Sequence, residues 1–210
     1  METLSPPKIP LSWLEIPDEL RVSATLEEYW SLVDEVDYQI EFVDGEIFSF
    51  MSEASLPHEV IVARLAFLFV GYFDAFNDCV VSSSNVKIQP PDNNKSFNAD
   101  VSVIRGKPEW REVLVGRQRR KGLSNPEIIV EIFSNSTRNY DQTTKLAAYQ
   151  TMPSLRHILF LEQHVPFARV VSRSEDSENW VVREFSSEND RIYLGDFSFR
   201  LGDVYRNLPA

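Results

Sequence analysis

One glutamate lies inside an apolar run, and its position needs a chemical explanation. Glu131 is part of the run 128–133, which is rich in β-branched residues and follows Pro126. Such a run predicts a strand buried on both faces. Taking an ionised carboxylate out of water is costly, so a buried acid is normally paired, protonated or bound to a metal. From this residue alone two roles stay open: a metal ligand, or an acid at an exposed strand end that pairs with an arginine.

A second acid and a lysine lie on elements expected beside the Glu131 strand. Asp100 lies in a predicted strand whose alternation places it on a polar face. Lys145 lies roughly two turns into the next predicted helix, from which a long side chain can reach back over the strand end. Two carboxylates near a lysine suit Mg²⁺, which takes one or two carboxylates and keeps water and phosphate ligands. The alternative is a solvated lysine that pairs with Asp141, four residues earlier.

Two more acids and a histidine are candidates to support such a site. The pair Asp44-Gly45 between alternating residues predicts a β-hairpin over 38–50, with Glu41 and Glu46 on one face. Either glutamate could be the one that supports the site. His58, at the head of a predicted apolar helix, could move a proton near neutral pH, or could simply cap the helix or form a hydrogen bond.

The order of elements predicts an α/β (α+β) fold, with a mixed central sheet flanked by helices. We expect an N-terminal arm over 1–23, which holds four of the twelve prolines, and a single domain over 24–210. Helices are expected over 25–33, from 58 onward, over 137–152 and over 203–207. Strands are expected over 80–89, 96–105, 128–133, 157–161, 168–171, 180–185 and 192–199. The strand, helix and strand between 128 and 161 predict a crossover that joins parallel strands, whereas the last strands should be antiparallel.

Composition excludes several classes of function. The chain has 210 residues, of which 43% are hydrophobic and 25% charged, as in ordinary globular domains. No run approaches the roughly 20 apolar residues of a membrane-spanning helix, and the N-terminus lacks the pattern of a signal peptide. We therefore expect a cytoplasmic protein that has no membrane partner. Cys79 is the one cysteine, which excludes internal disulfides and thiolate zinc sites.

Basic residues concentrate in one segment although the net charge is -11. Residues 105–121 contain seven of the 21 Lys and Arg residues. The negative net charge argues against nonspecific electrostatic binding of nucleic acid over a broad surface. This basic segment could still contact a phosphate backbone. The alternative is a solvated loop insertion without a partner.

These features together resemble the Uma family of restriction-endonuclease-like proteins, within the PD-(D/E)xK nuclease superfamily. The resemblance spans residues 25–206 and is carried by 40–46 (IEFVDGE), His58, 99–101 (ADV), 126–137 (PEIIVEIFSNST), Asp141, Lys145 and Tyr149. It implies that Asp100 and Glu131 hold the metal and that Glu41 or Glu46, with His58, supports the site. The superfamily lysine usually lies two positions after the strand glutamate, where this chain has Phe133. The resemblance therefore assigns that role to Lys145.

The resemblance favours an endonuclease that hydrolyses DNA phosphodiester bonds with water activated by Mg²⁺ or Mn²⁺. DNA would be its partner, with residues 105–121 as the contact segment, and a homodimer would be compatible with this role. A second interpretation is a catalytically inactive module of the same fold that binds DNA or protein, favoured by the acidic charge and by Phe133. A third is a metal hydrolase that acts on a smaller phosphate ester, because a fold does not fix a substrate.

Overall fold

The structure is a computed structural model that describes residues 20–33, 35–36, 38–49, 55–84, 86–92, 94–115, 118–134, 137–174 and 179–209. Most of the predicted N-terminal arm lies outside these residues. Its last part, Leu20–Ser23, forms strand β1, which pairs antiparallel with β3. The division of the chain into an arm and a single domain stays a prediction.

A six-stranded sheet carries Glu131 near its centre. Its order is β13-β12-β11-β10-β7-β4. These strands are β4 (Cys79–Ser83), β7 (Val101–Arg105), β10 (Pro126–Phe133), β11 (His157–Glu162), β12 (Ala168–Arg173) and β13 (Trp180–Phe185). Strands β10 and β11 are parallel, and Glu131 lies opposite Phe160. The other pairs are antiparallel, so the predicted parallel pair and mixed sheet are confirmed.

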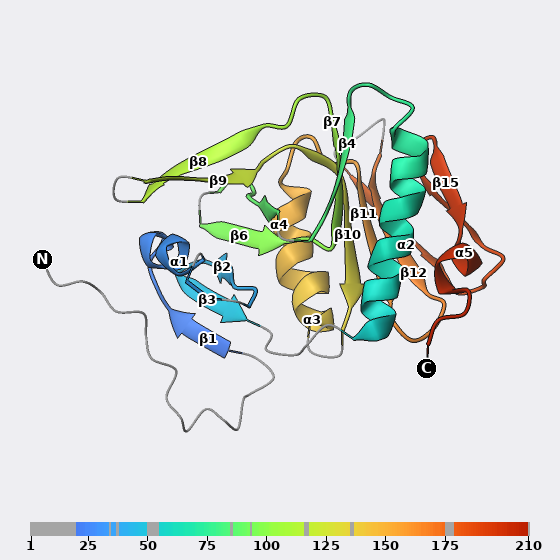
Figure 1. The fold of residues 1–210 in the computed structure, drawn as a ribbon, viewed down its shortest axis with the longest axis horizontal. Coiled ribbons are helices and arrows are strands. Elements are labelled where there is room, and N and C mark those ends of the chain that lie inside the picture. Colours follow the sequence, from blue (N-terminus) through green and yellow to red (C-terminus); the bar gives the residue numbers. More distant parts are fainter. Residues whose placement is uncertain are drawn as a thin grey trace, which may run out of the picture.

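A seven-stranded sheet forms the other part of the molecule, in the order β1-β3-β2-β6-β5-β9-β8 (Figure 1). Besides β1 its strands are β2 (Glu41–Val43), β3 (Glu46–Ser49), β5 (Lys87–Ile88), β6 (Lys95–Asn98), β8 (Trp110–Val115) and β9 (Gln118–Leu123). The predicted hairpin is confirmed as β2 and β3. Asp44 and Gly45 at its turn have φ angles of 49° and 91°. A tight two-residue turn needs such positive angles, which explains this residue pair.

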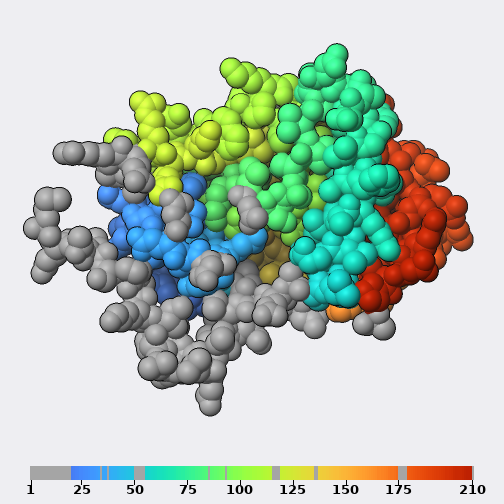
Figure 2. All heavy atoms as spheres, viewed as in Figure 1, coloured from blue at the N-terminus to red at the C-terminus, as the bar shows by residue number. Residues whose placement is uncertain are grey.

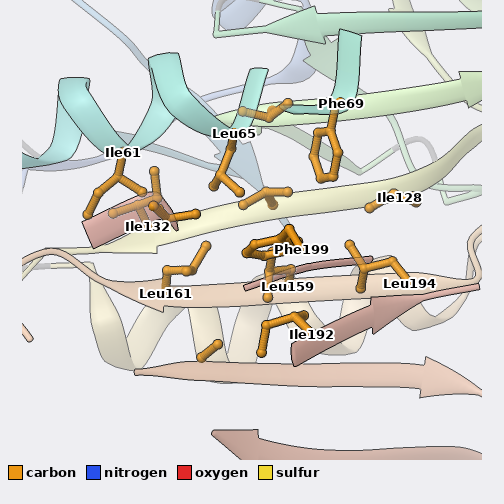
Figure 3. Close-up of a cluster of buried hydrophobic side chains, with 14 of the residues drawn as sticks. Ile61, Leu65, Phe69, Ile128, Ile132, Leu159, Leu161, Ile192, Leu194 and Phe199 are labelled. Atoms are coloured by element: carbon orange, nitrogen blue, oxygen red, sulfur yellow. The ribbon is translucent and has the colours of Figure 1, made fainter. Parts of the chain in front are cut away.

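Helix α2 (Leu56–Phe73) covers one face of the six-stranded sheet. Its Ile61, Leu65 and Phe69 lie against Ile128 and Ile132 of β10 (Figure 3). The helix begins at Leu56, with Ser55 as its N-cap, rather than after Pro57 as predicted. Proline is tolerated in the first turn because the amide hydrogen it lacks would have no partner there. By length and composition, α2 is the one described helix that could cross a membrane.

A second helical segment covers the opposite face of the same sheet. It consists of α3 (Arg138–Tyr140), a π-helical turn (Asp141–Lys145) and α4 (Leu146–Gln150), as predicted for 137–152. Strand alternation sends Ile128, Val130 and Ile132 toward α2. The intervening Glu131 therefore points toward α4, and its side chain is buried. The predicted strand buried on both faces is confirmed.

Two smaller helices and a terminal hairpin complete the fold. Helix α1 (Leu26–Leu32) starts with the predicted capping box between Thr25 and Glu28. Strands β14 (Arg191–Leu194) and β15 (Phe197–Arg200) form a hairpin instead of the one strand predicted over 192–199. Gly195 between them has a φ angle of 65°, which marks the turn. Helix α5 (Leu201–Tyr205) begins two residues before the predicted position.

Two other predictions about strands were wrong. The predicted strands 80–89 and 96–105 each divide into two, and the halves belong to different sheets. A period-two pattern shows which residues alternate but does not show when the chain leaves one sheet for another. Ser102 of β7 lies on the opposite face from Val101 and Val103, where it is buried and shares a hydrogen bond with Ser82. Most of the basic segment 105–121, for which a solvated loop was the alternative interpretation, forms the paired strands β8 and β9.

Candidate active site

The ammonium group of Lys145 lies where the two sheets meet and is surrounded by three carboxylates. Its Nζ lies 3.1 Å from Glu41 Oε1, 3.3 Å from Glu131 Oε2 and 3.4 Å from Asp141 Oδ1. It also donates to the main-chain oxygen of Asn98 at 3.0 Å. Glu41 belongs to the seven-stranded sheet and Glu131 to the six-stranded one. This buried cluster of Lys145, Glu41, Glu131 and Asp141 therefore connects both sheets to the helical segment.

The π-helical turn explains how one helix supplies several groups to the cluster. Four residues of α-helix exceed a full turn by about 40°. The wider π turn between Asp141 and Lys145 falls short of a full turn over the same four residues. The two deviations oppose each other, so Asp141, Lys145 and Tyr149 stay on one face of the helix. The Tyr149 hydroxyl donates to Glu131 Oε1 at 2.7 Å.

Asp100 lies at the point where β6 and β7 separate. Its Oδ2 accepts a hydrogen bond from the Ile132 amide at 2.7 Å, just beyond Glu131 on β10. Its Oδ1 lies 3.3 Å from Nε2 of His58, which reaches over from the start of α2. The side chains of Asp100 and His58 are 21% and 15% exposed, so they form a more open edge beside the buried cluster.

The remaining candidate residue, Glu46, lies on the hairpin without a described contact to the cluster. Glu46 pairs with Val43 across the hairpin, which puts it on the same face as Glu41, as predicted. Within the described part of the chain, no side-chain hydrogen bond or ion pair joins Glu46 to the cluster. Sequence reasoning did not include Asp141 and Tyr149 among the site residues, although their four-residue spacing from Lys145 was a usable signal.

Burial dominates the electrostatics of the cluster. It raises the pKa of Glu131 well above its usual range, against the opposing effect of Lys145. Burial also raises the pKa of Asp141 to about 6. Burial alone would lower the pKa of Lys145, but Glu131, Glu41 and Asp141 outweigh it, so its pKa lies above the ordinary value. In the same way, Asp100 and Glu59 raise the pKa of His58 against the effect of burial.

The residues present are compatible with a divalent cation. Three buried carboxyl groups surround one ammonium, so they must take up protons or share a further cation, and Oδ1 of Asp141 is buried without a well-formed hydrogen bond. Among the described residues no group of three or more His, Cys, Asp and Glu is arranged to hold a metal. A cation would therefore rely on Asp100 and Glu131, with water and phosphate oxygens as its remaining ligands. Magnesium accepts such a shell.

Comparison with known proteins fits this geometry. The family model Uma2, described as "Putative restriction endonuclease", matches residues 26–200, which include all the candidate site residues. The chain belongs to the Uma2 family. Enzymes with a restriction-endonuclease-like fold generally use a divalent metal, in line with the chemistry of Asp100 and Glu131.

Individual relatives of this Uma2 chain cover nearly its whole length. It is 28% identical to "Uncharacterized protein slr1290" of Synechocystis, over 87% of this chain and 91% of that protein. It is 27% identical to "Uncharacterized protein sll1609" of the same organism, over 83% and 93%. A crystal structure titled as "a putative nuclease belonging to DUF820" from Anabaena variabilis superposes with a TM-score of 0.64. That match covers 86% of this chain and 97% of the other at 11% identity, so it shows the fold, which is the predicted nuclease-like α/β fold.

Proposed function

We propose that this Uma2 protein is a DNA endonuclease that needs Mg²⁺ or Mn²⁺. The observation that carries the proposal is the joint placement of Glu131 and Lys145 beside Asp100, on a chain whose family and fold are those of proteins described as nucleases. Two carboxylates and a lysine at one end of a strand are the groups that phosphodiester hydrolysis by an activated water requires. Asp100 and Glu131 would hold the cation, which supplies Lewis acidity and a more acidic bound water.

The chain's own groups have separate tasks in this proposal. Lys145 would stabilise negative charge on the attacked phosphate or orient the water. Glu41 keeps the ammonium of Lys145 in place. The Oε1 atom of Glu41 is itself fixed, because it accepts a hydrogen bond from the main-chain N–H of Asn98 at 2.7 Å. His58 would exchange protons at the open edge through its contact with Asp100. Glu46 lies on the Glu41 face and would act at most through the cation's water shell.

The β8–β9 hairpin is the proposed contact with the DNA backbone. Residues 105–121 contain seven basic and two acidic residues in a chain of net charge -11. Several of the basic side chains are engaged within the fold: Arg105 pairs with Glu127, and Arg111 donates to the Pro91 carbonyl. Arg119 and Lys121 are exposed but also have partners: Arg119 forms an ion pair with Glu112 at 2.9 Å, and the ammonium of Lys121 lies over the Trp110 ring. The hairpin extends along one side of the molecule (Figures 1 and 2).

The direct test is incubation of the purified protein with supercoiled plasmid, with and without Mg²⁺ or Mn²⁺. We expect nicked and linear products only with metal, and none from Glu131→Gln. Glu127→Gln is a matched control, since Glu127 is on the same strand but pairs with Arg105 at 2.7 Å. Equal cleavage by Glu131→Gln and wild type, or none by wild type with either metal, would contradict the proposal.

A second candidate function is a binding module that retains the acids as a structural cluster. The burial of Lys145 and Glu131, which are 6% and 3% exposed, favours it, because a scissile phosphate must reach both residues. This candidate predicts DNA or protein binding without cleavage under every metal condition. The plasmid assay, combined with a binding measurement in Ca²⁺, distinguishes the two functions.

A further inference from the structure

The hydroxyl of Tyr149 makes the shortest contact with the Glu131 carboxylate. It donates to Oε1 at 2.7 Å, whereas Lys145 Nζ lies 3.3 Å from both oxygens. Tyr149 and Glu131 are 0% and 3% exposed, so bulk water does not compete for this bond. Hydrogen bonds to a carboxylate are short and strong in such surroundings.

The position of this hydroxyl is fixed by packing rather than by the carboxylate. The Tyr149 ring lies edge-on to Phe97 with 5.5 Å between centroids. It belongs to the buried cluster that also contains Ile129 and Met152. A ring packed among residues of β6, β10 and the turn that follows α4 cannot follow a rotating carboxylate. Tyr149 is therefore a rigid donor with one preferred acceptor.

Lys145 cannot give Glu131 the same fixed orientation. Its three N–H protons are shared among five nearby acceptor atoms: Asn98 O, both Glu131 oxygens, Glu41 Oε1 and Asp141 Oδ1. Because Lys145 Nζ is equally far from both Glu131 oxygens, it does not select which of them faces away from the cluster.

We propose that Tyr149 is a positioning residue that holds Oε1 of Glu131 and leaves Oε2 to face the divalent cation. This inference rests on the proposed function, because it assigns Glu131 as a metal ligand. Removing a residue that hydrogen-bonds to a metal ligand and orients it typically lowers metal affinity or activity by about 10- to 100-fold.

The test compares Tyr149→Phe with Tyr205→Phe, which serves as a matched control. Each substitution removes one buried hydroxyl; that of Tyr205 donates to the main-chain oxygens of Glu162 and Phe167 and lies outside the cluster. Calcium is titrated against the melting temperature, since it reports binding without requiring turnover. We expect the calcium midpoint of Tyr149→Phe to rise about 10- to 100-fold, and that of Tyr205→Phe to stay at the wild-type value. Plasmid nicking by Tyr149→Phe should recover as Mg²⁺ is raised, which a failure to fold would not allow.

Each remaining outcome is decisive. If wild type and Tyr149→Phe bind calcium equally, the positioning role is wrong while the proposed nuclease stands. If wild type ignores calcium and cleaves nothing with Mg²⁺ or Mn²⁺, both proposals fail together. If Tyr149→Phe melts too low for a thermal shift, calcium is titrated calorimetrically at low temperature on protein shown to be folded by circular dichroism. A variant that never folds makes Tyr149 a structural residue and overturns the inference.

Discussion

At the residue scale, the candidate site is defined by how burial and charge balance around Lys145. Three carboxylates surround one ammonium at 3.1–3.4 Å, and all four side chains are under 10% exposed. Separating such charges from water is expensive, so each partner is needed to compensate the others. The cluster is therefore part of the candidate catalytic site and also contributes to the stability of the fold.

Replacing Lys145 by methionine should make this dependence measurable. The methionine side chain is of similar length but uncharged, so it leaves Glu41, Glu131 and Asp141 without the ammonium group. Removing one partner of a buried ion pair typically costs about 3–5 kcal/mol, and we expect a decrease of this order in the free energy of unfolding, measured in urea. Lys107→Met, outside the cluster, should change stability by less than about 0.5 kcal/mol. Wild-type stability in Lys145→Met would mean that the three acids take up protons rather than remain as buried charges.

His157 should give the protein a separate sensitivity to acid. Burial, with a smaller effect from Arg156, lowers the pKa of His157 from 6.5 to about 4. The folded state thus favours the neutral ring: its contribution is complete above pH 6.5 and is lost as the pH falls toward 4. We expect about 1–3 kcal/mol of this acid-induced destabilisation to disappear in His157→Gln, measured by urea unfolding at pH 7 and pH 4.5. Parallel pH profiles for the two proteins would rule out this role.

At the element scale, the β8–β9 hairpin depends on one close approach. Strand β9 joins β5 at the pair Ile88 and Leu123, and Gly122 packs directly on Gln89. A Cβ added at Gly122 would lie 2.8 Å from the Cβ of Gln89, too close for any side chain. The hairpin also rests on the α1 core through Val113. These contacts join the basic hairpin to the rest of the fold.

Gly122→Ala should therefore destabilise the protein, whereas Gly71→Ala should not. Overpacking costs about 1–3 kcal/mol, and hydrogen exchange should show faster exchange in β8 and β9. Gly71 lies on an exposed part of α2 with nothing within 4 Å of an added Cβ. Alanine there should raise stability by about 0.5–1 kcal/mol through helix propensity. A neutral Gly122→Ala would show that the hairpin is not held at this contact.

At the scale of the whole molecule, charge is divided between a basic hairpin and an acidic remainder. The chain carries -11 overall, although seven of its 21 basic residues lie in 105–121. Phosphate contacts should therefore be confined to one side, and binding should weaken steeply with salt. The remaining acidic surface would repel DNA and limit the orientations in which it can bind.

Binding of a labelled duplex in Ca²⁺ tests this division. We expect the double variant Arg119→Gln/Lys121→Gln to bind more weakly, with a salt slope reduced by about 0.9 for each phosphate that the variant no longer neutralises. The control is Arg183→Gln/Arg191→Gln, a change of the same charge at exposed positions on β13 and β14. If both double variants bind with equally reduced affinity, binding follows net charge and the hairpin has no special role.

The sequence by itself determined the elements that local patterns control. The buried strand around Glu131, the turn at Asp44-Gly45, the capping box at Thr25 and the helix that carries Lys145 all follow from hydrophobic period, turn chemistry and capping. These features depend on neighbours within a few residues, which is why they can be recognised in one chain. The family resemblance was confirmed by a family model that spans residues 26–200.

Only the tertiary structure decided which groups meet and how they are shared. Glu41 and Glu131 lie on different sheets, yet both contact Lys145, because the chain changes sheet near Asp100. Tyr149 became a partner of Glu131 through a π-helical turn that no residue pattern marked. Such contacts join segments far apart in sequence, and their geometry depends on packing of the complete fold. Alternation and spacing fix only the face on which each side chain lies.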